Sequence, residues 1–142
     1  MSDHPSTDYS GLEVLSKDEC LELLASEPVG RIAFVHEGAP MVLPVNHHVE
    51  GWSVLFRTDL GSKLSAAIME RAVAFEVDHY DASDRSGWSV LVTGTATSVD
   101  DAEEIAELDQ LELSPWASGG ERVHWVRVQP DEISGRRVRA EG

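Results

Sequence analysis

Cysteine is scarce in this sequence, since Cys20 is the only one among 142 residues. A single cysteine excludes an internal disulfide framework and favours a reducing compartment, so we predict a cytoplasmic protein. Long apolar runs are also missing. No uninterrupted apolar stretch approaches the roughly 18–20 residues that span a bilayer, which excludes a transmembrane helix. The first ten residues are polar and acidic and lack the basic and apolar regions of a secretory signal.

Positive charge is the second scarcity. Lysine and arginine together number 11 against 26 aspartate and glutamate residues, and the formal net charge is −15. Lys17 and Lys63 are the only lysines. An acidic surface repels nucleic acids and anionic lipids, so we predict no nucleic-acid partner and no membrane partner. Any anion-binding site must therefore be local, built from a few cations and backbone amides.

The length fits one domain, since domains commonly hold about 100–200 residues. Apolar residues make up 42% of the chain, which is too many for a disordered protein. We expect a flexible N-terminal tail at residues 1–12, a single domain at residues 13–138 and a C-terminal tail at residues 139–142.

Local patterns predict mostly strands. Ser16 and Glu19 form a capping box that starts a short helix, and Pro28 and Gly30 end it. Pro44 should occupy a sheet edge or bulge, and Gly94 a bend or bulge. Strands are expected at residues 30–36, 41–49, 52–58, 72–78, 88–99, 122–128 and 133–138. A second helix is expected to start at Ser62. A third helix is expected at residues 100–113, capped by Asp100, with Ile105, Leu108 and Leu111 facing inward. This order predicts a mainly β (α+β) fold, a barrel of about six to seven mostly antiparallel strands with short flanking helices.

The stretch from Arg57 to Lys63 is the best candidate for chemistry. A strand ends in Arg57-Thr58, and after a short turn a helix opens on Gly61-Ser62-Lys63. Free amides at a helix start, a cap hydroxyl and nearby cations together suit a phosphate group. The spacing is not that of a Walker A loop. An ordinary helix start remains the alternative interpretation.

Other polar and aromatic residues give weaker signals. His47 and His48 are adjacent on a strand, so they point to opposite faces and cannot chelate one metal together. Either could donate a proton if it lines a pocket. Tryptophans at positions 88, 116 and 125 could stack on a planar ligand or belong to the core. No catalytic residue is indicated.

The order of several short motifs resembles the pyridoxamine 5′-phosphate oxidase-like flavoproteins over roughly residues 15–137. The motifs are Gly30-Arg31-Ile32-Ala33, Pro44-Val45-Asn46, Phe56 to Lys63, Val73 to Asp78 and Trp88 to Ala96. The resemblance implies a split β-barrel homodimer that binds FMN at the subunit interface.

The resemblance also implies cofactor contacts. Ser62 and Lys63 fall where the family binds the flavin phosphate, and residues 41–46 fall where a strand runs along the isoalloxazine ring. The implied cofactor-binding residues are Val45, Asn46, Arg57, Thr58, Ser62, Lys63, Trp88, Ser89 and Trp116.

The departures from the true oxidase separate the possible functions. The ring-binding strand has Met41 and Asn46 where the oxidase has arginine and lysine, and the oxidase's C-terminal arginine–histidine constellation is replaced by residues 132–138. Oxidation of pyridoxamine phosphate is therefore not expected. The sequence predicts an FMN-dependent oxidoreductase with an unidentified small-molecule substrate. The alternatives are a deazaflavin-dependent reductase, a flavin storage or sensing module, and a ligand-free barrel; other relatives of this barrel bind haem.

Overall fold

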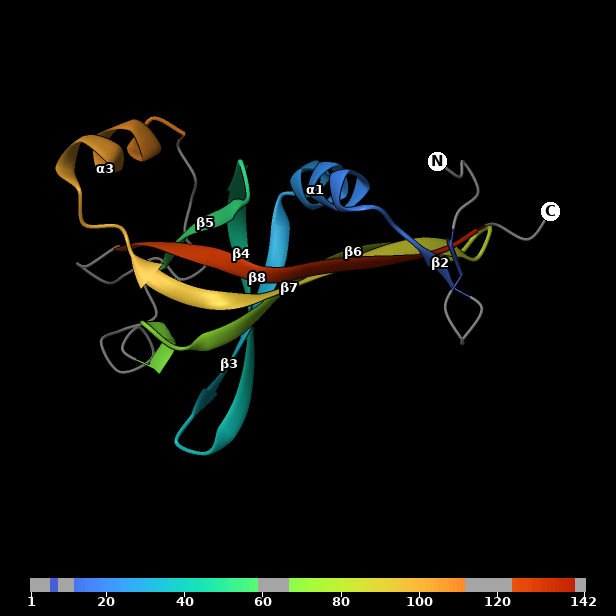
Figure 1. The fold of residues 1–142 in the computed structure, drawn as a ribbon, viewed down its shortest axis with the longest axis horizontal. Helices are drawn as coiled ribbons and strands as arrows, with labels where there is room; N and C mark the ends of the chain where they lie inside the picture. The colour runs from blue at the N-terminus through green and yellow to red at the C-terminus, as the bar shows by residue number, and fades with distance from the viewer. Residues whose placement is uncertain (1–5, 8–11, 59–66, 112–123, 140–142) are drawn as a thin grey trace.

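The structure is a computed structural model of the chain, and it describes all residues except 1–5, 8–11, 59–66, 112–123 and 140–142 (Figure 1). Most of the described chain is antiparallel sheet, which confirms the predicted mainly β fold. The elements are β1 (Ser6–Thr7), β2 (Glu13–Val14), α1 (Lys17–Ser26), β3 (Val29–His36), β4 (Ala39–Glu50), β5 (Ser53–Thr58), β6 (Ala72–Asp81), β7 (Ser86–Ser98), α3 (Ala102–Asp109) and β8 (His124–Val138).

The longer strands close on themselves. Their hydrogen-bonded order is β8-β5-β4-β3-β6-β7, and β7 pairs again with β8. This closure removes exposed sheet edges along most of the ring and makes a split-barrel-like fold. In Figure 1, α1 and α3 lie on one side of the long β6, β7 and β8 strands, while the β3–β4 hairpin extends to the other side. Residues 6–7 pair with β2, which in turn pairs with the end of β8.

The last strand corrects a prediction. Two strands, at residues 122–128 and 133–138, were expected, but the described part of this region is one 15-residue strand, β8. Pro130 lies opposite Gly94, where the register of β7 against β8 shifts, so the predicted bulge at Gly94 is confirmed. A Cβ on Gly94 would lie 2.1 Å from the carbonyl oxygen of Gln129. The bulge thus lets β7 follow β8 past the proline, and cross-strand pairing overrides the local turn signal.

Pro44 lies where the pairing of β4 changes. It pairs with Arg31 of β3, and among the described residues β4 pairs with β5 over residues 47–50. The position that continues this register opposite Pro44 lies outside the described residues, so the edge or bulge at Pro44 stays a prediction. Beyond it, Gly51 adopts a φ of +59° in the turn between β4 and β5, a conformation that glycine accepts without steric cost.

Helix α1 starts as predicted and is held at its end by a distant histidine. The side chain of Ser16 accepts a hydrogen bond from the backbone N–H of Glu19, and the carboxylate of Glu19 accepts one from the backbone N–H of Ser16. At the other end, Nε2 of buried His47 donates to the carbonyl oxygen of Leu24, with a separation of 2.7 Å. His47 and His48 lie on opposite faces of β4, with His47 in the core side, as alternation requires.

Two hydrophobic clusters fill the fold. The larger lies between the barrel strands and α1 and includes Phe56, Phe75 and Cys20. The smaller lies on the other face of β5 and β8, where Leu55, Val99, Leu108 and Trp125 pack together. Strand β5 is therefore covered on both faces.

Helix α3 covers that second face, with two differences from expectation. Its N-cap is Asp101, which accepts from the backbone of Glu104, whereas Asp100 instead accepts from Ser98. The prediction of Asp100 as cap was wrong by one residue because neighbouring aspartates have equal capping propensity. Leu108 is buried as expected, but Leu111 lies past the end of the helix and is exposed. The start of the helix predicted from Ser62 lies outside the described residues.

Candidate functional site

The end of β5 carries the first candidate residues, Arg57 and Thr58. Thr58 is buried, with 2% of its surface exposed. Arg57 lies opposite Trp125 of β8, and its guanidinium carbon is 5.6 Å from the centre of the indole ring. That separation is within the range of a cation–π contact. The strand end thus holds a cation on a fixed aromatic surface.

Trp125 is itself fixed from two directions. Its side chain is part of the smaller cluster, with 3% of the residue exposed, so it belongs to the core. Its Nε1 donates to Oδ1 of Asp109 on α3 over 2.8 Å. On the same face of β8, Arg127 pairs with Glu104 of α3. The sequence pointed to Arg57 and Trp125 separately, but their contact joins strands that are distant in the chain and has no local signal.

The residues predicted to run along a ligand ring divide between two faces of β4. Val45 is buried in the larger cluster and can offer only its backbone to a ligand. His47 faces Phe56 across the strand pair, so Asn46 and Arg57 both point to the opposite face. The structure therefore brings Asn46 and Arg57 to one face.

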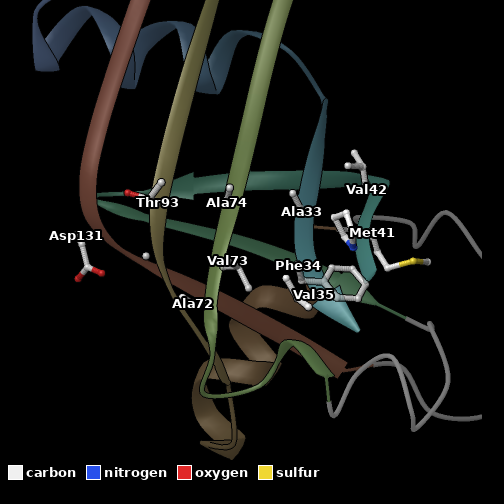
Figure 2. Close-up of a pocket in the computed structure, with 12 residues that line it drawn as sticks. Ala33, Phe34, Val35, Met41, Val42, Ala72, Val73, Ala74, Thr93 and Asp131 are labelled. Atoms are coloured by element: carbon white, nitrogen blue, oxygen red, sulfur yellow. The ribbon is translucent and has the colours of Figure 1, made fainter. Parts of the chain in front are cut away.

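An apolar groove begins further along β4. It has a volume of about 360 Å³ and lies between the β3–β4 hairpin, β6 and β7. Figure 2 shows Ala33, Val42 and Ala74 lining it from three strands. Val35 and Val42 are each 60% exposed, which is high for valine. Val42 and Asn46 share one face of β4 and lie about 13 Å apart at the rise of an extended strand.

Trp88 and Ser89 lie elsewhere. Ser89 pairs with Arg136, which is eleven residues beyond Trp125 on β8, a separation of about 35 Å along an extended strand. Figure 1 shows β8 crossing most of the long axis of the molecule. The structure therefore does not bring Trp88 and Ser89 to Arg57 within one chain.

A second hollow, of about 340 Å³, lies beside Trp88 and Ser89 and includes Glu76 and Asp78 of β6. Nη1 of Arg31 lies 3.2 Å from Glu76 and 2.9 Å from Asp78. Burial and the neighbouring Asp78 raise the pKa of Glu76 to about 7, although Arg31 opposes this shift. Sequence reasoning missed this cluster because Arg31 and the two carboxylates meet only through the β3–β6 pairing.

Three predicted cofactor-binding residues, Ser62, Lys63 and Trp116, lie outside the described residues. Among the residues that are described, no three His, Cys, Asp or Glu side chains come together in a way that could hold a metal ion. Cys20 is buried, and burial raises the pKa of its thiol, which suits a core residue.

Comparison with known proteins places the chain in a family. The family model described as pyridoxamine 5′-phosphate oxidase matches residues 16–137. The chain belongs to this family. An uncharacterized protein of Mycobacterium tuberculosis is 39% identical over 132 residues, which is 89% of this chain and 86% of that protein. Membership in the pyridoxamine 5′-phosphate oxidase family confirms the resemblance drawn from the sequence motifs.

Solved structures agree with this assignment. The FAD binding protein from Mycobacterium smegmatis is 41% identical, with a TM-score of 0.74 over 89% of this chain and 97% of that one. A FAD-binding protein from Mesorhizobium loti shares the fold at 22% identity, with a TM-score of 0.74 over 90% of this chain and 99% of that one. Across the described part of this family member, no helix is long and apolar enough to cross a membrane.

Proposed function

We propose that this protein binds a flavin nucleotide, with the phosphate-bearing end at Arg57 and the ring along β4. The observation that carries the proposal is the position of Arg57, whose guanidinium lies over the ring of Trp125 and whose side chain shares a face with Asn46. A planar guanidinium is well suited to phosphate recognition because its donors form a rigid fork. In a chain with a net charge of −15, such a local cation is needed to attract a phosphorylated ligand.

The remaining surface fits the other end of a flavin. The outer face of β4 leads from Asn46 past Pro44 to Val42, and the apolar groove lies at that end. A planar aromatic ring gains free energy when it covers such apolar surface. Arg57 and Asn46 would hold the polar end, whereas Thr58 is buried on the opposite face of β5. Val42 with its neighbours would exclude water from the ring.

We further propose that the site is shared in a homodimer. Family resemblance assigns Trp88 and Ser89 of β7 to the cofactor. Arg136, the β8 partner of Ser89, nevertheless lies about 35 Å along that strand from Trp125, the partner of Arg57. One flavin cannot reach both groups of residues in the same chain. A second copy of the chain that supplied Trp88 and Ser89 would complete the site, and the exposed Val35 and Val42 would supply apolar contact area.

The reaction class proposed is oxidoreduction of a small molecule. A bound flavin would supply the redox chemistry, and the chain would supply binding, orientation and exclusion of water. FMN is the cofactor expected from the sequence. FAD is the second candidate, because the relative from Mycobacterium smegmatis that is 41% identical is named for binding FAD.

The first prediction tests the cofactor. The purified protein should show a flavin absorption spectrum, or gain one on addition of flavin, and chromatography of the chromophore released by denaturation distinguishes FMN, FAD and a deazaflavin. Arg57→Ala should weaken flavin binding by about 10-fold or more, because a charge-assisted contact to phosphate contributes about 1.5–3 kcal/mol. Arg71→Ala, at an exposed position, is the control and should leave the affinity unchanged. A protein that takes up no flavin, or an Arg57→Ala variant that binds as tightly as the wild type, contradicts the proposal.

A further inference from the structure

Trp125 connects the candidate phosphate site to helix α3, which contributes no residue to that site. One edge of the indole donates to Asp109 at the end of α3, and its face lies under the guanidinium of Arg57. Leu55 and Leu108 pack with the same ring in the smaller cluster. The indole therefore has one position, which is determined jointly by α3 and by the core.

We propose that Trp125 and Asp109 are positioning residues for recognition of the flavin's phosphoryl group, acting through Arg57. This inference rests on the proposed function. A free arginine side chain has many rotamers, and each must be given up when it binds a ligand. Contact with a fixed indole removes much of that freedom in advance and orients the guanidinium, whose donors lie in its plane. Asp109 acts one step further away by fixing the indole.

The ligand class follows from the chemistry of the cation. A phosphate monoester in FMN and a pyrophosphate in FAD both present the oxygens that a guanidinium binds, whereas riboflavin has the same ring and no phosphate. Positioning of Arg57 should therefore change the affinity for FMN and FAD and leave the affinity for riboflavin nearly unchanged. If Trp125 had only a structural role, its substitution would lower the affinity for all three ligands alike.

The structure supplies a matched control. Glu104 also joins α3 to β8, through Arg127, but this contact does not include Trp125. Glu104→Ala and Asp109→Ala each remove one polar contact between the same two elements. Asp109 is exposed and Glu104 is half-buried, and both side chains are polar, so neither variant removes apolar core volume.

The experiment measures dissociation constants for FMN, FAD and riboflavin by quenching of flavin fluorescence. Asp109→Ala and Trp125→Phe, which lacks the indole N–H, should each raise the dissociation constants for FMN and FAD by about 5- to 10-fold. The dissociation constant for riboflavin should rise by less than about 2-fold. Asp109→Asn keeps an acceptor oxygen and should restore most of the affinity. Glu104→Ala should leave the ratio of FMN to riboflavin affinity unchanged. In an Arg57→Ala background, Asp109→Ala should have no further effect on FMN, because the two residues act as one unit.

The measurements separate an error in the phosphate site at Arg57 from an error in the positioning role of Trp125 and Asp109. If the wild type binds FMN and riboflavin equally, the phosphate site proposed at Arg57 is wrong and this inference falls with it. If the wild type prefers FMN and the preference survives in Asp109→Ala and Trp125→Phe, only the positioning role is wrong. Equal losses for FMN and riboflavin, or an unchanged effect of Asp109→Ala in the Arg57→Ala background, likewise overturn the positioning role.

Discussion

At the scale of single residues, His47 links stability to pH. Its Nε2 must carry the proton because it donates to the carbonyl oxygen of Leu24, and its ring contacts Phe75 edge-on at 5.0 Å. Burial lowers the pKa of His47 below its ordinary value of 6.5, more than the carbonyls of Leu24 and Pro28 raise it. The neutral ring is thus favoured in the folded state. The contribution of His47 to the free energy of unfolding is therefore present above pH 6.5. It is lost as the pH falls from 6.5 toward the lower pKa that His47 has in the folded state.

Glu76 acts in the opposite direction over an overlapping range. Its pKa rises from 4.5 to about 7, so the folded state favours the protonated carboxyl. That contribution is present below pH 4.5 and is lost as the pH rises toward 7. The stability profile of the wild type contains both effects, and only a comparison of variants separates them.

The prediction is that His47→Gln removes the histidine's part of the profile. The glutamine amide can still donate to Leu24, while the lost ring contact should cost about 1 kcal/mol at pH 7.5. This deficit should narrow as the pH falls to 5, since the wild type alone must then protonate a buried ring. Urea unfolding at several pH values measures it, with His79→Gln, at an exposed position, as the control. A deficit that stays constant with pH would show that His47 does not titrate in this range.

At the scale of elements, the pairing of β7 with β8 depends on Gly94. A methyl group there would meet the carbonyl oxygen of Gln129 at 2.1 Å, and that atom belongs to the backbone of the paired strand. We expect Gly94→Ala to destabilise the fold by about 2–4 kcal/mol, because the strands must separate at the bulge to admit the side chain. Gly38→Ala is the control for adding a methyl group, since nothing lies within 4 Å of its Cβ position, although its φ of +77° gives a small cost of its own. Equal costs at the two positions in denaturant unfolding would contradict the close approach.

At the scale of elements, the sequence predicted those features that depend on a few neighbouring residues. The capping box at Ser16 and the bulge at Gly94 each follow from one residue type and its neighbours. The single strand β8 was not predicted because its continuity comes from pairing with β7, which local turn signals do not reveal.

The candidate site shows the same division. Arg57 could be singled out from the sequence because it ends a strand just before a turn and helix start that suit a phosphate group. Its contact with Trp125, and the bond of Trp125 to Asp109, could not be predicted, because they join β5, β8 and α3. The ion cluster of Arg31, Glu76 and Asp78 escaped for the same reason, since 45 residues separate Arg31 from Glu76. Residue types indicate which chemistry is available, and only the tertiary fold decides which groups meet.

At the scale of the whole molecule, the separation between Arg57 and Ser89 predicts how the site is assembled. If one chain held a complete site, the two residues would have to meet within it, but about 35 Å of β8 lies between their partners. If two chains share each site, Arg57 of one protomer and Ser89 of the other act on the same flavin. Arg57→Ala and Ser89→Asp would each then weaken flavin binding at both sites of a homodimer. Sedimentation should first show wild-type protein at twice the chain mass of 15.5 kDa.

Mixing the two defective proteins decides between these arrangements. After unfolding and refolding together, random assortment makes about half of the dimers mixed, and each mixed dimer holds one site with both residues intact. About one quarter of all sites should therefore regain wild-type affinity for the flavin, which neither parent shows alone. Refolding each parent separately is the control and should recover nothing. An absence of recovery in the mixture, with mixed dimers demonstrated by differently tagged chains, would mean that each site is built within one protomer, since both kinds of chain would then remain defective in any combination.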